Sequence, residues 1–303
     1  METITCPLCH RGNQDAVITE HGYTGCLCPE CQVIYLSPRP TPEETLASYR
    51  QDHACVPASM YIAKTCYQTL HNRLTLRLLR RYCPAGALLE IGAGGGFFLE
   101  EARAAAFSVA AIEVNPTQAA AMRAKAIPCE EQALSDASFG GQHFEAIYHC
   151  DVLSHFSDPL ETFRRIHTRL QPGGYHLFET SNFGGVAPAG LRLVNTFQLP
   201  DHLFFFSPHS LRLLLEQSGF ALVALYRYAE TWHLRFAAAL RAARRLLAPA
   251  GPHRDTAIPA ALHLDDPLHR AYFHLLYFAR YDLGRLTARE QQPQTLIVVA
   301  RKV

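Results

Sequence analysis

Residues 87–96 combine an acidic side chain with closely spaced glycines, a pattern that suits the binding of a nucleotide-like ligand. Glu90 follows an apolar run, and the loop after it reads Glu90-x-Gly92-x-Gly94-x-Gly96. Glycine permits a tight turn and a close approach of the backbone to a ligand, and it lets the next helix begin close to the sheet. In dinucleotide sites the third glycine instead follows the second by three residues. An acid at the start of the loop favours a ligand that carries an ammonium group.

Two Cys-x-x-Cys pairs near the N-terminus have the spacing of a zinc site. They are formed by Cys6 and Cys9 and by Cys28 and Cys31. Each pair presents two thiolates on one turn, and a segment of about forty residues has too little core to fold without such a constraint. A closed site of four thiolates leaves no position for a substrate, so we expect a structural zinc ion. The alternatives are a redox pair or unrelated thiols, and Cys26 and His10 lie near enough to compete as ligands.

An alternation of strand and helix patterns must position these groups. Core strands are predicted at 87–91, 108–113, 126–130, 143–150, 175–180, 221–228 and 295–301. Helices are predicted at 61–82, 97–106, 116–125, 159–170 and 210–218. Thr41 predicts the start of another helix, short strands are expected at 16–20 and near Tyr23, and a turn is expected at 171–174. The alternation indicates an α/β fold with a mostly parallel, doubly wound, Rossmann-like sheet.

The same pass along the sequence divides the chain into segments. We predict a zinc ribbon over 1–40, a linker and helical cap over 41–85, a ligand-binding core over 86–230, a helical insertion over 231–293 and a final core strand over 294–303. The insertion is interpreted as a lid or an oligomer contact. Its arginines at 235, 241, 244 and 245 recur at helical spacing, which fits a solvated helix face or a clamp for an anionic substrate.

Length and composition exclude several classes of protein. The 303 residues are 49% hydrophobic and 18% charged, which is typical of a globular chain with an ample core. A formal net charge of +1 gives no general attraction to nucleic acid or to an anionic membrane. The sequence lacks an apolar run of about 18 residues and a secretory signal pattern. We therefore expect a cytoplasmic protein without a membrane partner, in which the cysteines are thiols or metal ligands rather than disulfides.

Four motifs together resemble those of the class I S-adenosylmethionine-dependent methyltransferases. They are Glu90-Ile-Gly-Ala-Gly-Gly-Gly, Glu113 at the end of the second core strand, Cys150-Asp-Val-Leu-Ser-His-Phe-Ser-Asp-Pro159 and Leu170-Gln-Pro-Gly-Gly174. The chain is most similar to small-molecule methyltransferases of the ubiquinone-biosynthesis type. Its cysteine pairs, followed by Tyr35-Leu-Ser-Pro-Arg-Pro, resemble a zinc segment that some of these enzymes carry. The resemblance implies a seven-stranded sheet with an antiparallel last strand, and a role in sugar or secondary-metabolite biosynthesis.

The resemblance also implies which residues contact S-adenosylmethionine. The expected contacts are Glu90, Gly92, Gly94, Gly96, Glu113, Asn115 and Asp151. Gly92 and Gly94 would pass under the methionine part of the cofactor, and Glu90 would orient the loop and face the amino group of the cofactor. Glu113 would accept hydrogen bonds from both ribose hydroxyls, unless it is an exposed acid at the end of a strand. Asn115 would flank the adenine, and Asp151 would contact cofactor or substrate or else cap a helix.

Two histidines are candidates for a general base. His155 lies one helical turn after Asp151, where the resemblance places a histidine in many relatives. His202 precedes the last core helix, in a segment that resembles the family's His-aromatic-Ser/Thr element. A structural histidine bonded to the backbone is the alternative for each. Ser154 stands where ubiquinone-type catechol methyltransferases carry a glutamate, which argues against a catalytic divalent ion and a catechol acceptor.

These patterns favour methyl transfer from S-adenosylmethionine to a small molecule, with oxygen as the preferred acceptor atom and nitrogen or carbon left open. A second hypothesis is an RNA methyltransferase, because ribosomal-RNA enzymes can also carry a zinc ribbon. The ribbon contains only Arg11 and Arg39 as basic residues, which argues against RNA, whereas the arginines after residue 234 favour it. A third hypothesis is a non-catalytic module that binds the cofactor. The oligomeric state is left open.

Overall fold

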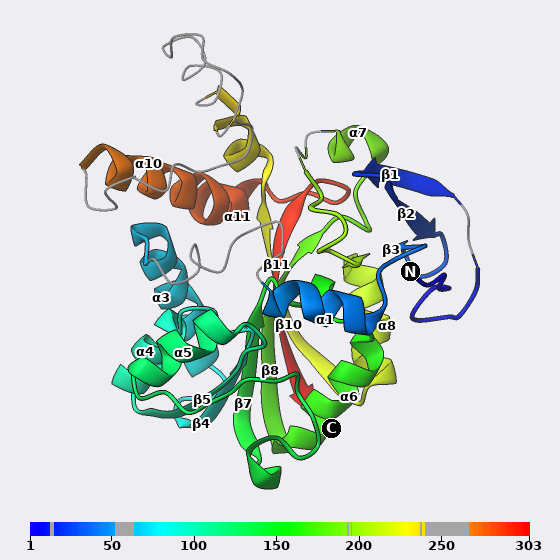
Figure 1. Ribbon diagram of the computed structural model, residues 1–303. Coiled ribbons are helices and arrows are strands. Elements are labelled where there is room, and N and C mark those ends of the chain that lie inside the picture. The colour runs from blue at the N-terminus through cyan, green and yellow to red at the C-terminus, as the bar shows by residue number, and fades with distance from the viewer. Residues whose placement is uncertain (13–14, 52–63, 193, 195, 237, 240–266) are drawn as a thin grey trace.

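The core of the protein is a seven-stranded sheet between two groups of helices (Figure 1). The computed structural model describes residues 1–12, 15–51, 64–192, 194, 196–236, 238–239 and 267–303. The strands of this sheet are β4 (Gly86–Ile91), β5 (Phe107–Ile112), β6 (Cys129–Glu130), β7 (Phe144–Cys150), β8 (Leu170–Asn182), β10 (Phe220–Ala229) and β11 (Gln294–Lys302). Their order is β10-β11-β8-β7-β4-β5-β6, and neighbours are parallel except where β11 pairs with β8 and β10. The predicted doubly wound sheet with an antiparallel last strand is confirmed.

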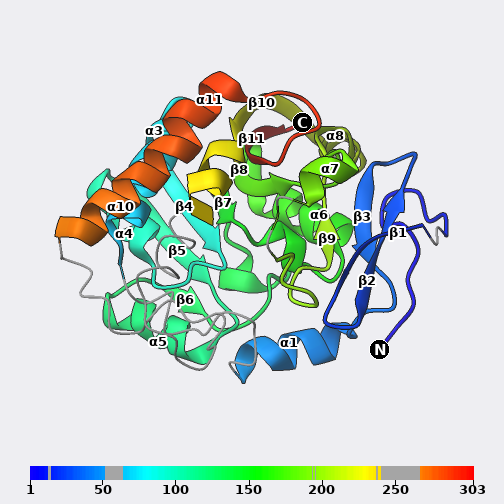
Figure 2. The same ribbon diagram turned by 90° about the horizontal axis from the view of Figure 1, so that it is seen from above.

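Each face of this sheet has its own helices, as the view from above shows (Figure 2). One face is covered by α3 (Cys66–Arg80), α4 (Phe97–Ala104) and α5 (Pro116–Ala124), and the other by α6 (Pro159–Arg169) and α8 (Pro208–Gln217). Alternate side chains of a strand point to opposite faces. Along β11, Leu296 and Val298 join the core on the side of α6 and α8, whereas Ile297 and Val299 join the core on the side of α3 and α4. Burial on both faces explains the unbroken apolar run of this strand.

Helices begin where capping residues stand rather than where the hydrophobic pattern starts. α1 (Pro42–Arg50) begins as predicted, because Thr41 forms a capping box with the third helical residue. α3 begins later than predicted because Thr65 caps it, and residues 61–63 lie outside the described residues. α8 begins earlier than predicted because Ser207 is its cap and proline fills the first position. The connections contain the short elements η1 (Ser138–Gly141), η2 (Leu153–His155) and α7 (Pro188–Leu191).

The start of β8 differs from the prediction. The sequence predicts a turn at 171–174, but the strand already begins at Leu170. The pairing with β7 steps from Phe144–Leu170 to Ala146–Tyr175. Residues 171–174 therefore form a bulge inside the strand, because more residues lie on β8 than on its partner between these two pairs.

The front of the chain forms a second sheet whose fourth strand comes from the core. Its order is β1 (Ala16–Glu20), β2 (Tyr23–Cys28), β3 (Val33–Leu36) and β9 (Phe204–Phe205), with antiparallel pairs throughout. The sequence predicts the first two strands but neither β3 nor β9. The segment predicted as a ribbon is thus hydrogen-bonded to the chain that follows β8. The division of the chain into domains stays a prediction.

The end of the predicted insertion is helical. It contains α10 (Pro267–Tyr277), the π-helical turn η3 (Phe278–Asp282) and α11 (Leu283–Thr287), and Figure 2 shows α10 and α11 alongside α3. Arg241, Arg244 and Arg245 lie outside the described residues, whereas Arg235 is exposed and lies over the ring of Trp232. Every helix in the described part of the chain is too short or too polar to cross a membrane.

Candidate active site and metal centre

The loop after β4 has a backbone that its glycines permit. Gly92, Gly94 and Gly96 have φ angles of 68°, 54° and 72°, in the left-handed region that favours glycine. A Cβ on Gly92 would lie 2.6 Å from Val152, and one on Gly96 would lie 2.9 Å from Met122 of α5. Side chains at these two positions would therefore push the loop away from its neighbours. Because glycine has no side chain, a ligand can approach the backbone of this loop closely.

A cavity of about 250 Å³ lies against this loop, at the carboxyl ends of β4, β7 and β8. Four residues predicted to contact the cofactor line it: Glu90, Gly92, Gly94 and Asp151. Six further side chains line the same cavity: Tyr67, His71, Tyr148, Glu179, Arg280 and Tyr281. Ligands of open α/β sheets bind at this edge. A larger hollow of about 550 Å³, lined by Asn182 and Arg212, contains none of the predicted site residues.

Glu90 is a buried acid, and among the described residues one of its carboxylate oxygens has no hydrogen-bond donor. Its side chain belongs to a residue only 5% exposed, and within the described part of the chain its Oε2 has no partner. Desolvation and the nearby Glu113 carboxylate raise the pKa of Glu90 well above its ordinary value. A buried polar atom of this kind costs free energy unless a ligand or water supplies the hydrogen bond. The loop and Glu90 therefore fit a ligand with an amino group, as S-adenosylmethionine has.

Glu113 and Asn115 hold the loop and the start of α5. Glu113 accepts hydrogen bonds from the backbone N–H of Gly94 (3.1 Å) and of Asn115 (2.9 Å). Desolvation raises the pKa of Glu113, and these two N–H groups oppose the rise. Asn115 caps α5 through the N–H groups of its first turn, and its Nδ2 donates to the carbonyl oxygen of Tyr49. A cofactor contact for either residue stays a prediction.

Asp151 lies at the mouth of the cavity, directly after β7. Its φ of 52° is unusual for a residue other than glycine and turns the chain sharply at the sheet edge. Asp151 is exposed, and the nearby Glu179 carboxylate helps to raise its pKa above the ordinary value. The alternative of a helix cap at Asp151 is wrong for α6, because Asp158 caps that helix.

His155 and His202, the predicted bases, lie against each other but not on this cavity. Their ring centroids are 4.8 Å apart, and Nδ1 of His155 lies 2.6 Å from the Tyr49 hydroxyl. Desolvation and the His202 ring lower the pKa of His155 to about 3, and desolvation also lowers the pKa of His202. As far as the described residues define the cavity, neither histidine lines it. Their catalytic role stays a prediction.

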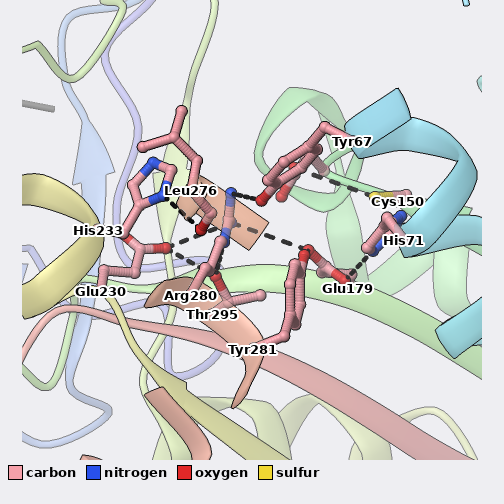
Figure 3. Close-up of polar contacts among 11 residues, drawn as sticks. Tyr67, His71, Cys150, Glu179, Glu230, His233, Leu276, Arg280, Tyr281 and Thr295 are labelled. Carbon is pink, nitrogen blue, oxygen red and sulfur yellow. Dashed lines mark hydrogen bonds and ion pairs between the residues drawn. The ribbon is translucent and has the colours of Figure 1, made fainter. Parts of the chain in front are cut away.

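A different histidine lies on the cavity. His71 of α3 is paired with Glu179 of β8, and its Nε2 lies 2.7 Å from the carboxylate (Figure 3). The Tyr281 hydroxyl donates to the other oxygen at 3.0 Å, and the Arg280 guanidinium lies 3.8 Å from it. Desolvation would raise the pKa of Glu179, but His71, Arg280 and Tyr281 outweigh this effect and hold it below its ordinary value. Glu179 is therefore an ionised carboxylate in a buried setting.

Arg280 joins this pair to the last strand of the sheet. Its Nε donates to the hydroxyl of Thr295 at 2.7 Å, and its guanidinium lies 3.3 Å from Glu230 and 3.4 Å from the Tyr67 hydroxyl (Figure 3). The guanidinium thus lies between two carboxylates, those of Glu179 and Glu230. The π-helical turn that carries it is a distortion that is frequent at functional sites.

Sequence reasoning missed this cluster because each member looks like a core position. His71 lies among leucines in a helix pattern, and Glu179 interrupts an apolar strand pattern near its end. One signal was available. Tyr67 and His71 are four residues apart, so they share a helix face, and a buried acid at the carboxyl end of a parallel strand is a candidate site residue.

The four predicted cysteine ligands come together at the front of the molecule. Their Sγ atoms lie within 4.8 Å of one another, and neither Cys26 nor His10 belongs to this group. Each Cys-x-x-Cys turn ends in the same way, with the N–H of His10 bonded to the Cys6 carbonyl and that of Gln32 to the Cys28 carbonyl. Four soft sulfur donors at this spacing fit a tetrahedral zinc ion.

The front sheet also clamps the segment that carries His202. The Glu20 carboxylate accepts hydrogen bonds from the backbone N–H groups of Phe197 (3.1 Å) and Leu199 (2.8 Å). These bonds help to hold the pKa of Glu20 below its ordinary value, against the desolvation that would raise it. Together with the pairing of β3 and β9, they fix the chain on both sides of His202.

Comparisons with known proteins match the core of this chain. A family model described as a methyltransferase domain matches residues 65–225, which is more than half of the chain. The chain is also similar to the ubiquinone biosynthesis O-methyltransferase of Albidiferax ferrireducens, with 26% identity over 128 residues that make up 38% of this chain and 51% of that protein. The chain thus matches about half the length of this curated relative.

Two solved structures share the fold at low sequence identity. A mycolic acid cyclopropane synthase complexed with SAH and CTAB has a TM-score of 0.55 and 16% identity, covering 87% of this chain and 99% of that one. A coclaurine N-methyltransferase bound to N-methylheliamine and SAH has a TM-score of 0.51 and 12% identity, covering 87% and 88%. At these identities the likeness concerns the fold alone.

Proposed function

The chain belongs to the methyltransferase domain family, and from this premise we propose that it transfers a methyl group from S-adenosylmethionine to the oxygen of a small molecule. When bound, S-adenosylmethionine supplies a methyl group that its sulfonium activates for displacement. The observation that carries the proposal is the shared cavity, which the glycine loop, Glu90 and Asp151 line together. The chain's own task is to align the acceptor and exclude water.

The cofactor contacts predicted from the sequence are part of this proposal. Gly92, Gly94 and Gly96 give the methionine part of the cofactor a flat backbone, and Glu90 faces its amino group. Glu113 turns its carboxylate to the ribose hydroxyls while Gly94 still donates to it. Asp151, at the cavity mouth, contacts the cofactor or the acceptor. Asn115 supports the adenine side of the site from its place at the start of α5.

Oxygen is the proposed acceptor atom because the curated relative is named as an O-methyltransferase. The two solved structures that share the fold are named for chemistry at carbon and at nitrogen, so the fold by itself does not select the atom. A place in sugar or secondary-metabolite biosynthesis accords with the resemblance of the front segment. We further propose that the cysteine cluster holds a structural zinc ion.

Calorimetric titration with S-adenosylmethionine tests the cofactor site. We expect Glu113→Ala to weaken binding by roughly tenfold or more, because hydrogen bonds to a charged group contribute about 1.5–3 kcal/mol. Glu131→Ala is the matched control, because this nearby acid is exposed and forms an ion pair with Arg123 at the surface. Glu113→Gln serves as a second variant, because it keeps an acceptor for the N–H of Gly94. A folded wild-type protein that does not bind the compound would refute the proposal.

A further inference from the structure

The cavity beside the glycine loop contains a histidine whose ring is held by a buried carboxylate. His71 and Glu179 line the same cavity as Gly92 and Gly94, and neither belongs to the glycine-loop motif. Glu179 is 2% exposed, whereas the side chain of His71 retains 10% of its surface. A titratable ring with a fixed orientation and access to the cavity is the arrangement that a general base needs.

We propose that His71 is the catalytic base that takes the proton of the acceptor's hydroxyl group, and that Glu179 is the positioning residue that orients it. This inference rests on the proposed function, since it places the acceptor in the cavity that the cofactor shares. The acceptor that fits is a neutral molecule with a hydroxyl group and an apolar or aromatic body.

The hydrogen bond to Glu179 selects the tautomer of the ring. An ionised carboxylate only accepts hydrogen bonds, so Nε2 of His71 must carry a proton and donate it to Glu179. In the neutral ring Nδ1 then carries the lone pair. Within the described part of the chain Nδ1 has no hydrogen-bond partner. It is not among the fully buried atoms that lack a partner, so it keeps some exposed surface. Nδ1 is therefore free to accept a proton from a molecule in the cavity.

Glu179 is itself fixed, which lets it stabilise the charged ring. The Tyr281 hydroxyl donates to it at 3.0 Å, and Arg280 is held in place by Thr295 and Glu230. A carboxylate that cannot move away stabilises the imidazolium formed when the base takes a proton. His71, Cys150 and Glu179 each offer one donor atom, and these three atoms lie within 4.8 Å of one another, which is close enough for a metal ion. The Nε2–H of His71 is already donated to Glu179, so we assign the site to proton transfer.

The charges around the cavity select the class of acceptor. Arg280 lies between Glu179 and Glu230, so its positive charge is already shared by two carboxylates. An anionic acceptor such as a phosphate ester would face this negative surplus and the acid Asp151 at the mouth. The rings of Tyr67 and Tyr148 supply apolar surface on the same wall. A neutral hydroxyl compound meets both conditions.

The proposed step balances without an oxidant or a reductant. The acceptor oxygen forms a bond to the methyl carbon as the bond between that carbon and the sulfonium sulfur breaks, and the electron pair of the broken bond stays on sulfur. The hydroxyl proton moves to Nδ1 of His71 and later leaves to solvent. The products are a methyl ether and the neutral thioether of the cofactor.

Nitrogen NMR of the histidine-labelled protein tests the proposal without an acceptor. The probe is S-adenosylhomocysteine, and His71→Gln or His71→Asn assigns the resonances of His71 by their disappearance. At pH 8 we expect His71 with a proton on Nε2 and none on Nδ1. Addition of S-adenosylhomocysteine should shift the Nδ1 resonance, because His71 lines the cavity in which this compound is proposed to bind. His143→Gln is the control, since His143 is exposed and should not respond.

The outcomes separate this inference from the proposed function. If calorimetry shows that S-adenosylhomocysteine binds, but Nδ1 carries the proton or does not respond, the assignment of His71 is wrong and the proposed function stands. If the probe does not bind at all, the proposed function fails first. Glu179→Gln adds a second arm, because an amide can donate to the ring or accept from it and should therefore mix the two tautomers of His71. An unchanged tautomer in that variant would remove the positioning role.

Discussion

His71 and the pair of His155 with His202 show two ways in which this protein holds an imidazole ring. His71 has an ionised carboxylate on one nitrogen and a cavity beside it. His155 has a tyrosine hydroxyl and another histidine as neighbours, and its pKa is lowered to about 3. A ring that resists protonation is a poor proton acceptor near neutral pH, whereas a ring backed by a carboxylate is a good one.

The two regions also differ in what holds them. His202 lies on a segment that the front sheet clamps through Glu20 and β9. His71 and Glu179 are held by α3 and β8 of the core, with Arg280 as the link to β11. Position in a family motif therefore points to His155 and His202, whereas the tertiary environment points to His71. Variants in one region should therefore leave the other region largely unchanged.

Loss of the proposed zinc ion should give the largest effect, and it should affect the His202 region alone. Structural zinc contributes on the order of 10 kcal/mol to the folding of small metal-bound segments, so Cys6→Ser should release the ion and loosen the front sheet. Hydrogen exchange should then rise over residues 16–36 and 196–205. Affinity for S-adenosylhomocysteine should change little, because the glycine loop belongs to the other sheet.

Cys26→Ser is the matched control for zinc release. Cys26 is buried in the front sheet but does not belong to the group of four cysteines, so this variant should keep about one zinc ion per chain. Metal content by atomic absorption and exchange by mass spectrometry decide between the variants. A loss of cofactor affinity on zinc release would show that the two regions are coupled and would weaken the comparison.

Loss of the His71 ring should give the next largest effect, on turnover. With an acceptor found in a panel of neutral hydroxyl compounds, His71→Ala should lower kcat by about 10²–10⁴-fold, which corresponds to roughly 3–5 kcal/mol. KM for S-adenosylmethionine should remain close to that of the wild type, and added imidazole should restore part of the rate. His202→Ala and His155→Ala should each stay within about tenfold of the wild type. If either of these variants lost more kcat than His71→Ala, the general base would be His155 or His202 rather than His71.

The sequence predicts the sheet well because its rules are local. The run of apolar residues in β11 and the glycines after β4 determine a buried strand and a turn by themselves. Helix starts are also local, and errors there arise from caps such as Thr65 that the hydrophobic pattern does not show. The cysteine pairs could be recognised for the same reason, because the spacing within each pair is part of the sequence, and the structure brings the two pairs together.

The polar cluster could not be predicted, because it depends on contacts between distant segments. His71 and Glu179 are separated by 108 positions, and Tyr281 reaches Glu179 across 102. No local pattern says that α3 and the π-helical turn meet over the end of β8. The environment of His155 was equally hidden, since Tyr49 reaches it from a helix that precedes it by 106 positions.

A third histidine environment extends the comparison. His149 and His176 are completely buried beside each other among phenylalanine rings, and within the described part of the chain none of their ring nitrogens has a partner. Burial lowers the pKa of His149 to about 3 and that of His176 well below its ordinary value. These rings have neither the carboxylate of His71 nor the hydroxyl contact of His155, so they should affect stability rather than catalysis.

The sign of that effect follows from proton binding. Below a pH of about 6.5 the unfolded chain protonates both histidines while the folded protein does not, so stability should fall by about 1.4 kcal/mol per pH unit for each ring. His176→Leu has a similar volume and removes one of these groups. It should leave stability at pH 7.5 within about 1 kcal/mol of the wild type and reduce the loss between pH 7.5 and 5.5 by roughly 1 kcal/mol. Urea unfolding at both pH values measures this, with exposed His143→Gln as the control that should keep the full loss. If His176→Leu and the wild type lose equal stability between pH 7.5 and 5.5, the buried His176 ring can be protonated in the folded protein. Its environment would then resemble that of His71.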